Sequence, residues 1–184
     1  MDALPARLRL VIQRARDVHV VADGLARGGF AHGLVVYAGF GRQIQTAPSD
    51  DASLSHSVCD EASLALAARK VFDLRTFAEE AGATKDRMHL SVRDIRGGVA
   101  LVSQFTLWAD CRKGNRPGFQ MATPPEAAKQ SFHRLVDHFR SAAAQTPGVT
   151  CVTGVFGADM AISCINDGPV TYLFDVAQGQ ILSF

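Results

Sequence analysis

Hydroxyl and amide side chains follow an apolar run near the middle of the chain, and these residues are best suited to chemistry. Glycines at 97–98 suit a tight turn, and residues 99–102 read Val-Ala-Leu-Val, which is typical of a buried strand. Ser103, Gln104 and Thr106 follow at the end of that strand. Burying such groups without partners costs about 1–3 kcal/mol each, so their position favours a ligand site on a rigid strand.

A simpler interpretation is that these side chains face solvent or bond to a neighbouring strand. A second stretch bears on this choice: residues 166–169 read Asn-Asp-Gly-Pro between two predicted strands. The simplest prediction there is a hairpin turn. However, proline donates no amide to a strand ladder, and a Gly-Pro bond can be cis at modest cost. A cis bond would aim two successive carbonyls the same way, forming a backbone wall that contacts a ligand without side chains.

Composition predicts an ordinary globular protein with one domain over residues 1–184. The chain is 47% hydrophobic and 20% charged, and its net charge is +1. So small a charge gives no overall field for nucleic acid, and any such contact must rest on a local patch. We find no apolar run near the ~20 residues that span a bilayer and no N-terminal secretory signal. We therefore expect no membrane contact.

Cysteine and histidine usage favours neither a disulfide framework nor a metal site. No CxxC pair occurs among Cys59, Cys111, Cys151 and Cys164, so we expect reduced thiols in a cytoplasmic protein. The histidines lack metal-ligand spacing such as HExxH. We predict no metal and no cofactor.

The order of elements predicts an α/β protein with layered, mostly antiparallel β-sheets and two main helices, not a Rossmann sheet. One helix is expected from Ser57 with Asp60 in a capping box, and another from an N-cap at Thr123 to a residue before Pro147. Their apolar faces are typical of core scaffold. Strands are expected at 8–13, 17–21, 33–39, 89–92, 99–102, 149–153, 160–165 and 170–175. Residues 42–56 are predicted to form a surface insertion, and residues 176–184 a short C-terminal tail.

A cationic loop follows the SQFTL stretch at 103–107. Arg112, Lys113 and Arg116 offer a local phosphate contact, with Trp108 and Phe119 nearby for stacking on bases. A solvated surface loop explains the same charges.

Two motifs together give the chain a family resemblance. Residues 103–107 read SQFTL and residues 166–171 read NDGPVT, which match the SQFTL and NxGPxT motifs of the D-aminoacyl-tRNA deacylases. The segments 11–14, 112–117 and 154–160 are also similar to that family. The resemblance covers roughly residues 8–175. The N-terminal extension, the insertion, the loop at 79–87 and the tail depart from the family without interrupting either motif.

The resemblance implies a homodimer that hydrolyses the ester between a D-amino acid and the 3′ end of tRNA. Gly168 and Pro169 of one subunit, joined by a cis bond, would reach into the partner's pocket beside the SQFTL strand, with Asn166 in the same substrate-binding element. A wall of their carbonyls would exclude an L side chain and leave room for a D side chain. Glycine has no side chain to exclude, so glycyl-tRNA is an expected substrate.

The resemblance assigns catalysis to Ser103, Gln104, Phe105 and Thr106. Backbone amides around Phe105 and Thr106 can stabilise the oxyanion, and Thr106 can act as a nucleophile or position the substrate. No histidine lies in either motif to activate a threonine. We therefore favour a scheme in which the terminal 2′-hydroxyl of the tRNA helps to activate water.

The resemblance also assigns Phe156, Ala158 and Met160 to the pocket for the terminal adenosine. Arg14 would hold the Gly-Pro element in place, although a surface arginine at a strand end is the simpler interpretation. Two rival functions remain open. One is a nucleic-acid-binding module without hydrolysis, and the other is a threonine hydrolase of small esters that needs no tRNA.

Overall fold

A computed structural model describes residues 6–42, 58–79 and 88–182. Within them one sheet has the strand order β4-β3-β2-β1-β5-β6. The elements along the chain are β1 (Arg7–Ala22), β2 (Leu25–Gly41), α1 (Glu61–Asp73), β3 (Gly98–Ser103), the 3₁₀ turn η2 (Phe105–Trp108), α2 (Pro125–Ala144), β4 (Thr150–Thr153), β5 (Met160–Ala177) and β6 (Gln180–Leu182).

The sheet is mixed. β1 pairs with β2 and β5 in antiparallel fashion, and β5 pairs with β6 in the same way. β2, β3 and β4 run parallel to one another. The predicted α/β class with two main helices is confirmed, and the antiparallel pairs join the longest strands. The parallel part matters most for function, because the ends of parallel strands meet at one edge of a sheet.

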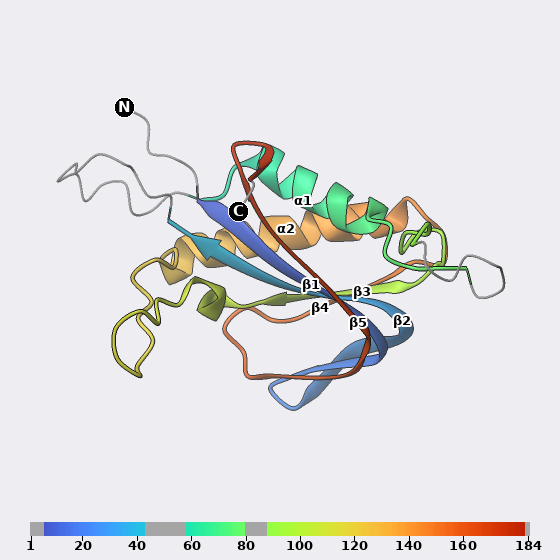
Figure 1. The fold of residues 1–184 in the computed structure, drawn as a ribbon, viewed down its shortest axis with the longest axis horizontal. Coiled ribbons are helices and arrows are strands. Elements are labelled where there is room, and N and C mark those ends of the chain that lie inside the picture. The colour runs from blue at the N-terminus through green and yellow to red at the C-terminus, as the bar shows by residue number, and fades with distance from the viewer. Residues whose placement is uncertain (1–5, 43–57, 80–87, 183–184) are drawn as a thin grey trace.

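Both helices lie side by side over one face of the sheet (Figure 1). Alternation along β1 sends Leu8, Leu10 and Ile12 into the core beneath them, where all three are fully buried. The helices meet through an edge-to-face contact between Phe72 and Phe139, whose ring centroids lie 5.6 Å apart. The helical periodicity of the sequence therefore identified core scaffold correctly.

The helix starts differ from the sequence prediction. Ser57 lies outside the described residues, and α1 is capped by Asp60 itself, whose carboxylate accepts the amide of Ser63 at 2.8 Å. α2 begins after Pro124, and the predicted cap at Thr123 is wrong. The Thr123 amide instead donates to the Phe40 carbonyl at 2.9 Å, which ties the start of α2 to the end of β2.

β5 passes straight through the stretch that was predicted as a hairpin. In the pairing of β1 with β5, Gln13 faces Thr171 and Ala15 faces Asn166, so residues 167–170 bulge opposite Arg14 alone. Pro169 therefore lies where the pairing of β1 with β5 requires no amide donor, a position that proline tolerates. The strands expected at 160–165 and 170–175 are thus one long strand, and residues 167–170 form an irregular part of it, not a hairpin turn.

The two predicted surface segments fare differently. Nearly all of the 42–56 insertion lies outside the described residues. The tail predicted for residues 176–184 partly belongs to the sheet, because β5 includes the buried Val176 and Ala177 and β6 pairs back onto it.

Candidate active site

A cleft of about 770 Å³ opens where the parallel strands end. The chain leaves β2 at Gly41, β3 at Ser103 and β4 at Thr153, and the segments at or just after these ends line the cleft. The beginning of α2 closes another side. Ligands bind at this edge of α/β sheets because loops, rather than a continuous ladder, form the surface there.

The cleft brings together predicted residues that are far apart in the sequence. Ser103, Gln104 and Phe105 line it from the end of β3, and Phe156, Ala158 and Met160 line it from the link between β4 and β5. The other lining residues are Tyr37, Ala38, Gly39, Phe40, Arg42, Val102, Phe119, Ala122, Thr123, Pro124, Pro125, Ala128, Gly157, Asp159 and Ile162.

Thr106 lies on the exposed 3₁₀ turn beside the cleft. Its hydroxyl donates to Oε1 of Gln104 at 2.6 Å. The first bond of the turn is donated by the Leu107 amide to the Gln104 carbonyl at 3.3 Å, so the preceding amides of Phe105 and Thr106 lack acceptors within the turn. Among the described residues no histidine or carboxylate bonds to Thr106.

An aromatic pair lies on the cleft surface. Phe105 and Phe119 meet edge to face with ring centroids 4.9 Å apart, and 54% and 39% of the two residues remain exposed. Phenylalanines this exposed leave ring faces open to a base or another planar group.

Sequence reasoning missed several lining residues, including Tyr37, Ile162 and Thr123. Burial is the main cause that raises the pKa of Tyr37, with the nearby Cys164 thiol adding to it. The apolar run Val35-Val36-Tyr37 predicts a strand, but only the structure reveals that Tyr37 lines the cleft. Thr123 has a buried hydroxyl with no partner among the described residues.

The Gly168–Pro169 bond is cis, as expected from the sequence. Arg14 holds this segment: its Nε lies 3.0 Å from the carboxylate and 3.2 Å from the carbonyl oxygen of Asp167, and its Nη1 donates to the Thr76 carbonyl at 2.7 Å. The simpler interpretation of Arg14 as a surface arginine at a strand end is therefore wrong, because its guanidinium bonds to the Gly-Pro segment and to the Thr76 carbonyl. Asn166, Gly168 and Pro169 lie on the surface of β5.

The Gly-Pro segment does not reach the cleft of its own chain. Ser103 lies three strand spacings across the sheet from Phe174, and Pro169 lies five residues before Phe174 in β5. Strand spacings of about 4.8 Å and rises of about 3.3 Å per residue put Pro169 on the order of 20 Å from the 3₁₀ turn. The structure thus separates the two motifs within one chain.

The sequence matches the family described as D-Tyr-tRNA(Tyr) deacylase over residues 11–175. This match spans both motifs, the cleft and the Arg14 contact. The chain belongs to this family.

Curated relatives in the family cover nearly the same length as this chain. A D-aminoacyl-tRNA deacylase of Solidesulfovibrio magneticus is 42% identical over 92% of this chain and 96% of its own. Proteins of the same name from Chlorobaculum tepidum and Geobacter metallireducens are 40% and 39% identical, each over 91% of this chain and over 97% and 95% of their own lengths.

Solved structures share the fold. The c-Myc DNA unwinding element binding protein superposes with a TM-score of 0.68 at 27% identity, covering 90% of this chain and 96% of its own. A probable eukaryotic D-amino acid tRNA deacylase gives a TM-score of 0.66 at 17% identity, covering 92% and 99%. The second likeness concerns the fold alone.

The cationic loop of this deacylase-family chain is closed by a bridge between Asp110 and Gly118. Arg112 donates to Asp110 at 2.7 and 2.8 Å, and these bonds lower the pKa of the Asp110 carboxyl to about 2. The ion pair neutralises one loop cation locally. Lys113 and Arg116 are exposed and remain suited to a phosphate contact.

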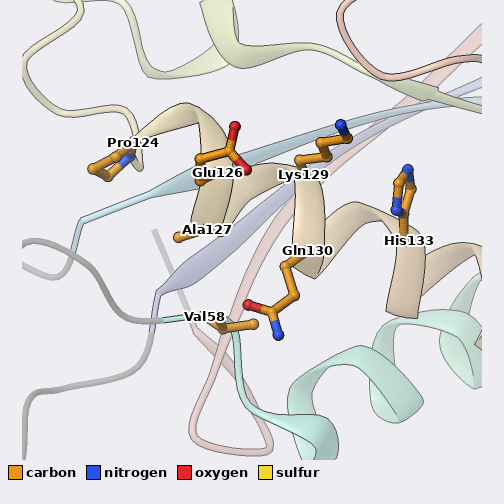
Figure 2. Close-up of a pocket in the computed structure, with 7 residues that line it drawn as sticks. All are labelled: Val58, Pro124, Glu126, Ala127, Lys129, Gln130 and His133. Carbon is orange, nitrogen blue, oxygen red and sulfur yellow. The ribbon is translucent and has the colours of Figure 1, made fainter.

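A second hollow runs along the outer side of α2, with Glu126, Lys129 and His133 on the helix and Val58 on the segment before α1 (Figure 2). It measures about 520 Å³ and contains no residue of either family motif. We assign no role in the reaction to it.

Within residues 6–42, 58–79 and 88–182 no cluster of three or more histidine, cysteine, aspartate or glutamate side chains could hold a metal ion. No helix in these ranges is both long and apolar enough to cross a membrane.

Proposed function

We propose that the chain is a hydrolase that cleaves the ester between a D-amino acid and the 3′ end of tRNA. One observation carries this proposal: in a member of the deacylase family, the Ser103–Phe105 segment lines a cleft at the ends of parallel strands. The same cleft is lined by Phe156, Ala158 and Met160. Their apolar surfaces suit the terminal adenosine. Such a substrate implies a cytoplasmic protein.

The 3₁₀ turn supplies the groups for transition-state stabilisation. The amides of Phe105 and Thr106 precede the first bond of the turn and can donate to the oxyanion of the tetrahedral intermediate. The Thr106 hydroxyl donates a hydrogen bond to the side-chain amide oxygen of Gln104, which cannot act as a general base. We therefore assign Thr106 a positioning role, with the tRNA 2′-hydroxyl helping to activate the attacking water.

Selection of the D-isomer requires a second copy of the chain. Because the Gly-Pro segment lies far from its own turn, it can meet substrate only in the cleft of a partner. Ile165 and Leu173, on either side of this segment in β5, are 46% and 49% exposed and offer apolar surface for that partner. In the homodimer, main-chain atoms of Gly168 and Pro169 would crowd an L side chain.

A deacylation panel tests the reaction. We expect release of the amino acid from D-tyrosyl-tRNA and from glycyl-tRNA, because glycine has no side chain for the Gly-Pro segment to reject. L-tyrosyl-tRNA should remain acylated under the same conditions. Absence of turnover on D-tyrosyl-tRNA would contradict the function, and absence on glycyl-tRNA alone would contradict the account of selection.

Mixed dimers test the transfer of the Gly-Pro segment between subunits. A Gly168→Ala chain keeps its cleft, and an Ala158→Trp chain has its cleft filled but keeps Gly168. If the segment acts across subunits, mixing the two impaired chains creates mixed dimers in which one cleft faces an intact segment, and each mixed dimer should recover about half of the wild-type activity. If it acts within one chain, the mixture is no more active than the average of the separate chains.

A nucleic-acid-binding module without hydrolysis is the second candidate. It is favoured by the structural likeness to a protein named for binding a DNA unwinding element. The net charge of +1 gives it little support. Tight binding of duplex DNA without release of amino acid from D-tyrosyl-tRNA would favour this candidate.

A further inference from the structure

A fully buried carboxylate lies on β5 near the 3₁₀ turn. Asp175 is 0% exposed. The Arg9 guanidinium donates two hydrogen bonds to its carboxylate, from Nε to Oδ1 at 2.8 Å and from Nη2 to Oδ2 at 2.9 Å. Arg7 adds a contact of 2.6 Å to Oδ2. A carboxylate removed from water needs such partners, and its bonds to Arg9 raise the pKa of that guanidinium.

Arg9 also reaches the turn that carries Thr106. Its Nη1 donates to the carbonyl oxygen of Leu107 at 3.2 Å. Its guanidinium carbon lies 4.3 Å from the ring centroid of Trp108, compared with 5.8 Å for Arg7. Arg9 is therefore the arginine that joins the buried carboxylate to the turn.

Glycines in β2 leave room for the same indole and its turn. A Cβ on Gly41 would come within 2.1 Å of Trp108, and one on Gly39 would lie 2.6 Å from the Gln104 carbonyl oxygen. The turn thus packs closely against β2 and is also in contact with Arg9 of the adjacent strand β1.

We propose that Arg9 is a positioning residue for the reaction, holding the Phe105–Trp108 turn in the orientation that presents Thr106 and the two preceding amides to substrate. The proposal rests on the proposed function for its catalytic consequence. Arg9 acts through Leu107 and Trp108 and is not among the residues that line the cleft. A rotation of the turn would misalign the oxyanion donors while leaving the adenosine-binding part of the cleft intact.

The paired variants Arg9→Met and Arg7→Met test this role, because both remove a cation from Asp175 but only the first removes the bond to Leu107. We expect Arg9→Met to lower kcat on D-tyrosyl-tRNA about tenfold with little change in KM, as small misplacements of catalytic groups do. Arg7→Met should keep kcat within about twofold, since the turn stays in place. Equal losses of kcat in both variants would overturn the proposal.

Fluorescence gives a readout that does not depend on activity. Trp108 is the chain's single tryptophan and is 7% exposed, so its emission reports on the turn directly. We expect a red shift and stronger acrylamide quenching in Arg9→Met, and a smaller change in Arg7→Met, because the Arg7 guanidinium lies farther from the ring and has no bond to Leu107. Unchanged quenching in folded Arg9→Met would overturn the proposal, whereas inactivity of the wild-type protein would contradict only the proposed function.

Arg9→Lys covers the case in which Arg9→Met does not fold. Lysine keeps the positive charge beside Asp175, but its single ammonium cannot reproduce the planar fork that joins the carboxylate to the Leu107 carbonyl. We expect wild-type thermal stability with increased quenching and a lowered kcat. An Arg9→Lys protein with wild-type kcat and quenching would show that charge alone suffices and would refute the positioning role.

Discussion

The Thr106 hydroxyl donates to the side-chain amide oxygen of Gln104 at 2.6 Å, within the motif that lines and borders the cleft. This bond orients the hydroxyl without activating it. An amide oxygen is too weak a base to remove the hydroxyl proton and leave an alkoxide on Thr106. It links Thr106 to a residue on the cleft wall.

Replacing Thr106 should therefore reduce turnover without abolishing it. We expect Thr106→Ala to lower kcat on D-tyrosyl-tRNA about tenfold, in line with the loss of one positioning contact, and Thr106→Ser to stay near wild type. Single-turnover deacylation measures both. A Thr106→Ala protein that binds tRNA normally but has no turnover at all would make Thr106 the nucleophile.

Gly168→Ala should damage both folding and selection. Gly168 has φ +117°, and a Cβ there would lie 2.8 Å from Val170 Cγ2 and 3.1 Å from Arg14 Nη2. The strain should cost about 1–3 kcal/mol, and displacement of the segment should lower deacylation of D-tyrosyl-tRNA. Thermal unfolding and the deacylation assay follow the two effects.

Gly24→Ala is the matched control for that variant. Gly24 has φ +75° with open space around it, in the turn between β1 and β2. It should lose stability with unchanged activity per folded molecule. If Gly168→Ala also keeps wild-type activity and the wild-type preference for the D-isomer, the Gly-Pro segment has no part in selection.

Phe119→Leu should weaken substrate binding more than catalysis. Stacking of a base on an aromatic ring is worth about 1–3 kcal/mol, so losing the ring beside Phe105 should raise KM for D-tyrosyl-tRNA about tenfold with kcat retained. Leu25→Ala serves as the control, because Leu25 is exposed and belongs to no part of the cleft. A change in kcat alone would argue against stacking.

Alkylation should distinguish the cysteines. Burial raises the pKa of the Cys59 thiol to about 12 and that of Cys151 to about 11, so both stay protonated at about pH 8 and react slowly. Cys111 is exposed and should react first with iodoacetamide, as followed by peptide mass spectrometry. In urea all four should react. Equal labelling of Cys59 and Cys111 in the native protein would contradict the packing around α1.

Local patterns predicted the elements well but the connections between them poorly. The apolar spacing in α2 predicts a buried face that includes Phe132 and Phe139, because helical periodicity depends only on nearby residues. The path of β5 through Pro169 was mispredicted, because a proline is a strand break only where the partner strand requires its amide. That requirement depends on the register with β1, which the sequence of β5 does not contain.

The same distinction applies to the site. Ser103 and Gln104 were recognisable because polar groups end an apolar strand, and the family motif extended this to Phe105 and Thr106. Tyr37 lines the cleft only because β2 and β3 are parallel neighbours, and that pairing is not encoded in either strand alone. The separation of Pro169 from its own cleft likewise follows from sheet order.

The cleft draws its walls from residues 37–42, 102–105, 119–128 and 156–162. More than a hundred residues of chain separate the first contributor from the last, so no short fragment of the protein carries a usable site. A substrate bound in the cleft contacts all four segments, which come together only after the slow, long-range steps of folding are complete. Occupancy by tRNA should accordingly protect the whole chain from proteases and raise its melting temperature, rather than merely ordering the loops around the cleft.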